Sequence, residues 1–374
     1  MRKLTRVMAG FASVAAAAAL MAGSVTAASA DPIASNGKAV APAYYDIVGV
    51  GSNTTEYVMD QFSINYNKTV KVHNAAHPFF YSWDALPKGA NAASTAFKIK
   101  PKTGCTVIGR PDGSGAGVKA LDQNQKDGKT GHYCIDYGRS SGGRSSTSPK
   151  EGPGGVIYVA FAKDAITWAV DSAAHDAPAT LNTAQLKGIF TCATKNWNQV
   201  GGKNAPIKVY LPQAGSGTLS TWEKFMGITT LGSCVNQAPE ENEGTNGVFK
   251  NNPNAIFIYS IGAYVAQKFH SASCTAKAPA KGQNQFGCNV TGVLALGKIA
   301  GTQPIVANKI NPKFPATYWR TVYNVLRFSK GTPFNMAKTV APFFARTGYL
   351  CSAKAAPIIQ AYGFVVDKAC GSVS

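Results

Sequence analysis

Three short segments of the 374-residue sequence combine glycine with hydroxyl or amide side chains, and a helical pattern follows each of them. They are residues 49–54, 113–117 and 215–218. Glycine lets the backbone approach a ligand closely, and the first N–H groups of a helix have no partner inside it, so each segment could bind an oxyanion. Serine and asparagine also begin helices merely as caps. Three such segments in one chain favour anion binding but do not identify the anion.

The elements around these segments alternate between strand and helix. Asn53 and Glu56 have the spacing of a capping box, and so do Asn182 and Gln185, while Gly227 could end the helix that follows residue 218. The sequence therefore predicts an α/β protein. We expect strands at 45–48, 156–162, 166–170, 207–211, 256–259 and 318–328, helices after 53, at 182–190 and at 218–226, and a final helix and strand within 353–366.

Residues 181–190 (LNTAQLKGIF), 196–202 (NWNQVGG) and 215–218 (GSGT) resemble, in order and spacing, motifs of the phosphate-binding proteins of phosphate ABC transporters. Residues 49–52, 136–141 and 361–364 are similar to further segments of that family. The resemblance identifies the chain as a divergent secreted member. It implies a two-lobed, periplasmic-binding-protein-like (type II) fold, in which two strands cross between the lobes and the cleft encloses the ligand.

The long apolar runs 156–161 and 318–326 flank the best-matching motifs, and we expect them to be the crossing strands. Lobe one then comprises residues 41–155 plus 320–374, and lobe two comprises 156–319. We also expect Tyr45 and Val209 to belong to separate sheets.

The resemblance implies phosphate contacts at positions that match the family motifs. Ser141 stands where the family has a carboxylate that accepts a proton from phosphate, and Pro212 stands where it has an arginine. Because serine carries no charge that would repel sulfate, we expect a weaker preference for phosphate over sulfate. The implied contacts are Asn53, Thr54, Ser114 or Gly115, Ser141, Ser216, Gly217 and Thr218.

Two arginines could supply the missing positive charge. Arg110 begins the sequence RPDGSG, which resembles the family's RxDGSG, and Arg139 lies beside Ser140, a further candidate contact. Either guanidinium could form a bidentate pair with an oxyanion. An ion pair between Arg110 and Asp112 is the alternative for the first of them.

Residues 138–142 (GRSSG) also fit the G-x-S-x-G pattern of a serine nucleophile, and Asp171 with His175 or His270 would follow in hydrolase order. A loop rich in Gly and Ser follows the motif where a helix would be needed. A secreted serine hydrolase using Ser140 therefore remains an alternative, as does a cell-wall or partner-binding module that kept the fold without the ligand. Our main expectation is a binding protein with no enzymatic activity, no cofactor and no metal site.

The first 30 residues have the pattern of a signal peptide: a basic start, an apolar run over 7–25 and the cleavage triad Ala28-Ser29-Ala30. An even number of cysteines in an exported chain predicts disulfides. We expect neighbouring cysteines to pair in order, because each consecutive pair encloses one compact segment. They are Cys105, Cys134, Cys192, Cys234, Cys274, Cys288, Cys351 and Cys370.

The net charge of +19 reflects a shortage of acids, since only 18 residues are Asp or Glu and charged residues make up 15% of the chain. Removing residues 1–30, which carry three basic and no acidic side chains, leaves +16. The basic residues are dispersed and aromatics are ordinary in number, which argues against nucleic acid. We expect a secreted monomer, extracellular or periplasmic, whose ligand is an inorganic oxyanion, phosphate first and sulfate second. An ABC permease or an anionic cell-wall polymer would be its partner.

Overall fold

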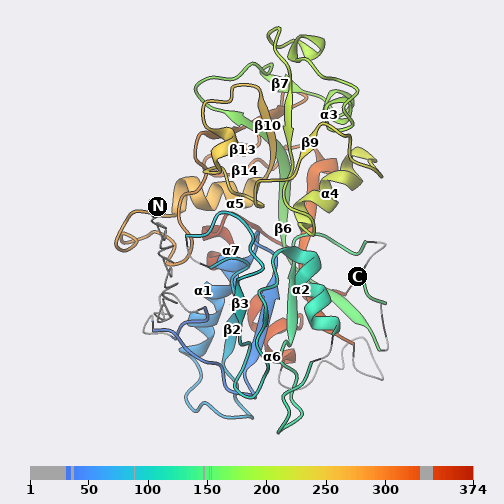
Figure 1. The fold of residues 1–374 in the computed structure, drawn as a ribbon. Coiled ribbons are helices and arrows are strands. Elements are labelled where there is room, and N and C mark those ends of the chain that lie inside the picture. Colours follow the sequence, from blue (N-terminus) through green and yellow to red (C-terminus); the bar gives the residue numbers. More distant parts are fainter. Residues whose placement is uncertain are drawn as a thin grey trace, which may run out of the picture.

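The computed structural model describes residues 31–373 except 35–37, 88, 124, 146–147, 151, 153 and 329–339. The predicted signal peptide lies outside the described residues. The chain folds into two lobes, each with its own hydrophobic cores, and Figure 1 shows the lobes stacked end to end. Within the described residues, no helix has both the length and the apolar character that a membrane crossing requires.

The first part of the chain builds most of the lower lobe in Figure 1. Its elements are β1 (Ile47–Gly51), α1 (Glu56–Asn67), β2 (Phe80–Ser82), β3 (Lys98–Ile99), β4 (Ile108–Gly109), α2 (Gly113–Asp122) and β5 (Tyr137–Ser140).

The long strand β6 (Val156–Asp171) then leads into the upper lobe. The upper lobe contains β7 (Thr180–Leu181), α3 (Thr183–Phe190), β8 (Lys208–Tyr210), α4 (Gly217–Met226), β9 (Val235–Asn236), β10 (Ala255–Ser260), α5 (Ile261–Val265), β11 (Leu294–Leu296), β12 (Lys298–Ile299), β13 (Ile305–Val306) and β14 (Lys309–Ile310). The chain returns through β15 (Trp319–Arg327) to α6 (Ala341–Phe344), α7 (Ala356–Ala361) and β16 (Val365–Val366).

One hydrogen-bonded path of strands joins both lobes, in the order β2-β1-β5-β15-β6-β10-β8-β9. Our expectation of separate sheets for Tyr45 and Val209 is therefore wrong: β1, which begins just after Tyr45, and β8, which contains Val209, lie on the same path. The reason is the length of β6, whose 16 residues pair with β15 in one lobe and with β10 and β11 in the other.

Strand β6 crosses between the lobes near its middle. Its residues up to Ala162 belong to the cores of the first lobe, and those from Ala165 onward belong to the cores of the second. The sequence predicted two strands here, 156–162 and 166–170, with a break at the charged Lys163 and Asp164. The strand continues through both charges because Arg320 lies directly opposite Asp164 in the β15 register.

The pair of Asp164 and Arg320 fixes the point where the crossing strands meet the second lobe. The Arg320 guanidinium donates to Asp164 Oδ2 from Nε at 2.9 Å and from Nη2 at 2.7 Å. Ser260 Oγ also donates to this oxygen at 2.8 Å, and Gly262 N donates to Oδ1 at 2.9 Å. Asp164 is fully buried. A buried carboxylate with this many donors ties β6, β15, β10 and the start of α5 into one unit.

Local signals in the sequence account for much of this fold. Asn182 and Gln185 form the predicted capping box of α3, and Gly227 ends α4 with a left-handed backbone (φ 58°). The capping box predicted for Asn53 and Glu56 is wrong, because α1 begins after Thr55 and the Asn53 amide donates to Asp112 at 3.0 Å instead.

The predicted order of disulfides is confirmed. The four bonds are Cys105–Cys134, Cys192–Cys234, Cys274–Cys288 and Cys351–Cys370.

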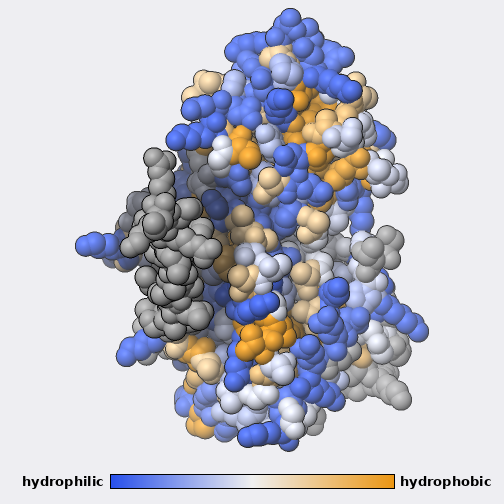
Figure 2. All heavy atoms as spheres, viewed as in Figure 1, coloured by the Kyte–Doolittle hydropathy of each residue, from blue (hydrophilic) through white to orange (hydrophobic). Residues whose placement is uncertain are grey.

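The face shown in Figure 2 is mostly hydrophilic, and its hydrophobic side chains form several separate groups over both lobes. The large apolar residues that are most exposed, Val72 and Val107, lie far apart in the sequence. Scattered apolar residues of this kind are normal on a protein surface and do not require a partner.

Replacing Arg320 tests the importance of the pair at the crossing. We expect Arg320→Met to lower the free energy of unfolding by about 3–5 kcal/mol, because it leaves the Asp164 charge buried without its partner. Lys203→Met is the control, since Lys203 is 72% exposed in its ion pair with Asp176 and should contribute less than about 1 kcal/mol. Chemical denaturation measures both values. Equal losses in the two variants would contradict this role for the buried pair.

Candidate functional site

The three glycine-rich turns of the sequence meet where the lobes face each other. Gly115 N donates to Gly215 O across the lobes at 2.9 Å. A Cβ atom on Gly117 would lie 2.5 Å from the Cα of Gly51, so this approach of backbones requires glycine. The turns begin or precede α1, α2 and α4, as the sequence predicted.

Four hydroxyl side chains converge beside these turns, and we call them the hydroxyl cluster: Thr54, Ser114, Ser141 and Thr218. Thr54 Oγ1 and Thr218 Oγ1 are 3.4 Å apart although they come from different lobes. Ser114 Oγ lies 3.3 Å from Ser141 Oγ and accepts a hydrogen bond from Ser141 N at 3.0 Å. All four residues are buried. The sequence predicted each of them as an anion contact, and the structure brings them together.

The carboxylate of Glu241 lies at the centre of the hydroxyl cluster. Its Oε1 accepts hydrogen bonds from Thr218 Oγ1 at 2.7 Å, from Ser141 Oγ at 3.1 Å and from Thr54 Oγ1. Glu241 is 3% exposed, and its other oxygen, Oε2, is buried without a hydrogen-bond partner among the described residues. The cluster therefore already holds one oxygen of an anion, and that anion is a side chain of the same protein.

The buried segment 239–244 brings Glu241 to this position. Asn242 has a left-handed backbone (φ 60°), a conformation that asparagine tolerates better than most residues. Its side chain donates to Thr54 Oγ1 at 3.0 Å and accepts from Ser260 N at 3.0 Å. Gln213 Oε1 accepts from Glu241 N at 2.8 Å. Several independent bonds thus hold the segment against the cleft.

Two further carboxylates lie beside Glu241. Asp112 Oδ1 accepts from Gln213 Nε2 at 3.2 Å, which links the two lobes, and Glu240 Oε1 accepts from Ala93 N at 2.6 Å. Burial, together with the nearby negative charge of Asp112, raises the pKa of Glu240 to about 8. Burial also raises the pKa of Asp112. Three carboxyl groups therefore lie close together in a protein with few acids, and burial favours the protonated form of Glu240 and Asp112.

The structure places both candidate arginines away from the hydroxyl cluster. Arg139 is fully buried, and its guanidinium donates to Ser52 O, Gly51 O, Trp83 O and Ser82 Oγ at 2.6–3.1 Å. These four acceptors use its donors within the first lobe.

Arg110 bonds neither to the hydroxyl cluster nor to Asp112, the two partners that the sequence suggested. Its Nη1 donates to Asp31 Oδ2 at 2.7 Å and to Asp84 O at 2.9 Å. The alternative ion pair with Asp112 is therefore not the one formed. The guanidinium groups of both arginines bond to acceptors outside the hydroxyl cluster, so the expectation that one of them faces the anion disagrees with these contacts.

The remaining predicted contacts support the cleft in other ways. Ser216 caps α4 by accepting from Leu219 N at 3.1 Å. Gly217 packs so closely that a Cβ atom there would lie 2.4 Å from Ser114 Oγ, and Asn53 bonds to Asp112. Ser140 Oγ donates to Gly142 O at 2.7 Å.

The groups of the hydrolase alternative do not assemble into a triad in these contacts. Asp171 accepts from the backbone N–H groups of Ala173 and Ala174, and His175 Nδ1 lies 3.0 Å from Ala177 O. Ser140 is bonded within its own turn.

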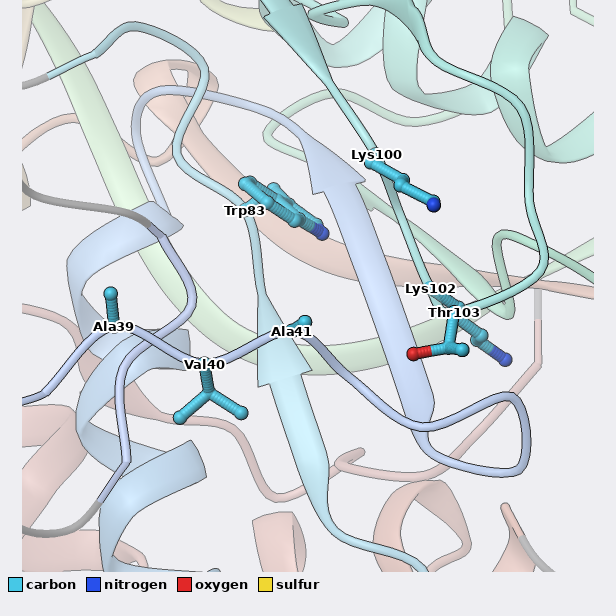
Figure 3. A pocket seen from close by; sticks show the side chains of 7 residues that line it. All are labelled: Ala39, Val40, Ala41, Trp83, Lys100, Lys102 and Thr103. Carbon is cyan, nitrogen blue, oxygen red and sulfur yellow. The ribbon is translucent and has the colours of Figure 1, made fainter. Parts of the chain in front are cut away.

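A cavity of about 300 Å³ lies elsewhere on the first lobe (Figure 3). Trp83, Lys100 and Val40 are among the side chains that line it, and none of its lining residues belongs to the hydroxyl cluster. Lys102, also in the lining, pairs with Asp136 at 2.6 Å. This cavity is therefore separate from the candidate anion site.

Comparison with known proteins agrees with the two-lobed architecture. Residues 84–346 match the family model described as a PBP superfamily domain. The chain belongs to this superfamily. An ABC-type phosphate transport receptor from Vibrio cholerae has a similar fold, with a TM-score of 0.53 and 17% identity over 86% of this chain and 100% of that one. A protein from Clostridium perfringens, solved with bound phosphate and described as a phosphate ABC transporter substrate-binding protein, gives a TM-score of 0.56 and 15% identity over the same shares.

Glu241 was not among the site residues that we predicted from the sequence of this superfamily member. One signal could have indicated it: Glu240, Glu241 and Glu243 fall within four residues, although the whole chain has only 18 acids. Such a cluster in an acid-poor chain favours a specific role. The sequence could not show that the segment folds back 187 residues along the chain to Thr54.

The raised pKa of Glu240 predicts a pH dependence of stability. The folded protein keeps a proton on Glu240 between pH of about 4.5 and 8, where the unfolded chain releases it, so stability should fall as pH rises through this window. Burial also raises the pKa values of Glu56, to about 8, and Asp60, to about 7, which act in the same direction. We expect Glu240→Gln to make the decline shallower. Melting temperatures from pH 5 to 8 test this, and curves parallel to the wild type would refute it.

Proposed function

We propose that the protein binds a small inorganic oxyanion, phosphate first, between its two lobes. The observation that carries the proposal is the convergence of Thr54, Ser141 and Thr218 on a single anionic oxygen. Side chains from both lobes take part, so an anion bound there would stabilise the closed arrangement through contacts that an open arrangement lacks. The starts of α1, α2 and α4 add favourable helix dipoles nearby.

The comparisons support phosphate as the first candidate ligand. Both similar structures are described as phosphate transport proteins, and one was solved with phosphate bound. One motif shared with phosphate-binding proteins lies at the hydroxyl cluster, since GSGT supplies Thr218 at the start of α4.

The protein would act outside the cytoplasm. Four disulfides are typical of oxidising compartments, and the first 30 residues have the pattern of a signal peptide. The monomer would either deliver its anion to an ABC permease or, through its basic surface, stay near an anionic cell-wall polymer.

Removing single hydroxyls should weaken phosphate binding. We expect Thr218→Val and Ser141→Ala each to raise the Kd for phosphate roughly ten- to hundredfold, because a hydrogen bond to a charged group is lost. Thr69→Val is the control, since its hydroxyl is exposed and bonds only to Tyr66 O at 2.7 Å. Isothermal titration calorimetry measures all four proteins. If no variant differs from the wild type, or if the wild type instead cleaves esters in a manner lost in Ser140→Ala, the proposal is wrong.

Sulfate should compete with phosphate more strongly than in a site built to reject it. Ser141 lacks the negative charge that would repel a fully ionised anion, so the preference for phosphate over sulfate should stay below about a thousandfold unless the neighbouring Glu241 carboxylate stays in the site and repels sulfate itself. Calorimetry with the two sodium salts at equal ionic strength gives the ratio. A larger ratio would show that another group discriminates between the anions.

A further inference from the structure

We propose that Glu241 is an internal ligand of the oxyanion site, so that an external anion binds only by displacing this carboxylate. The inference rests on the proposed function, because it assigns Glu241 the role of setting the affinity of the same cleft. It would make anion binding a competition between the protein's own side chain and the ligand.

The Glu241 carboxylate occupies the hydroxyl donors that an external oxyanion would need. Three hydroxyls that would contact an oxyanion all donate to Glu241 Oε1, which leaves them no second proton to donate. The carboxylate is 3% exposed and belongs to a segment that is buried throughout. Glu241 therefore uses the donors and the space of the site together.

The two lobes pack tightly around this carboxylate. Gly217 of the second lobe packs against the hydroxyls of Ser114 and Ser141 so closely that a Cβ atom would lie 2.4 and 2.5 Å from them. A tetrahedral anion with four oxygens is bulkier than the single carboxylate oxygen held there. The lobes would have to separate and Glu241 would have to withdraw before such an anion could enter.

The Glu241 carboxylate, as internal ligand, satisfies the site only in part. Oε1 receives three donors, whereas Oε2 is buried with no hydrogen-bond partner in the described part of the chain. A buried charged oxygen without a donor is costly. An external oxyanion that distributes the same donors over several oxygens can therefore replace the carboxylate.

Tethering determines how strongly Glu241 competes. A side chain held beside its site acts at an effective concentration that dissolved anions must exceed, and the bonds of Asn242 and Gln213 hold this segment in place. Removing the carboxylate should therefore tighten binding of phosphate and of sulfate by similar factors. This separates competition from an acceptor role, in which Glu241 would take a proton from phosphate and its loss would weaken phosphate binding alone.

The test compares wild type, Glu241→Ala and Glu241→Gln with the control Glu223→Gln. Glu223 lies on α4, in the same lobe, and is not one of the residues that bond to the cluster. Glu241→Gln preserves the shape of the side chain and serves if the alanine variant fails to fold. Calorimetry and melting temperatures are recorded with sodium phosphate, sulfate and acetate at equal ionic strength, against chloride. Acetate supplies the missing carboxylate as a separate molecule.

We expect Glu241→Ala to bind phosphate and sulfate roughly ten- to hundredfold more tightly than the wild type or Glu223→Gln. Acetate should raise the melting temperature of Glu241→Ala and of no other protein in the set. Unchanged or weaker phosphate binding in the Glu241 variants would overturn the inference. If acetate stabilises Glu241→Ala but no protein binds phosphate or sulfate, the internal ligand stands and the proposed function fails. If no anion distinguishes Glu241→Ala from the wild type, the inference fails.

Discussion

The cleft is organised around a buried negative charge that must be hydrogen-bonded from both sides. Glu241 is almost fully buried, so its carboxylate depends on the hydroxyls of Thr54 and Ser141 in one lobe and Thr218 in the other. Burying a charge without such donors would cost several kcal/mol. This requirement brings the starts of α1 and α4 together and closes the lobes on one another.

The crossing strands join the two lobes at a fixed point. Asp164 and Arg320 hold β6 and β15 to the second lobe at a pair that is itself buried. The same strands contribute to the cores on both sides, with β6 changing lobes between Ala162 and Ala165. Each disulfide joins cysteines that are neighbours along the chain and restrains one local segment. Each lobe is thus restrained within itself, and β6 and β15 join the two lobes.

Local chemistry made much of this structure predictable. Caps such as Asn182 and Gly227 mark helix ends through hydrogen bonds made within a few residues. The glycine-rich turns predict places where two backbone segments come close together. Long-range pairing is different. Nothing near Arg139 in the sequence shows that its guanidinium would be taken by carbonyls of residues 51, 52 and 83, and nothing near Glu241 shows that it would reach Thr54. The hydroxyl donors of the site could be predicted from the sequence. The carboxylate of Glu241 that accepts their hydrogen bonds could not, because its position depends on tertiary packing.

The most direct test of the oxyanion site is a crystal structure of Glu241→Ala grown with phosphate. We expect phosphate between the lobes, with its oxygens in hydrogen-bond contact with Thr54, Ser141 and Thr218. Phosphate bound elsewhere on the molecule, or a cleft that closes on itself with no anion between these hydroxyls, would contradict it.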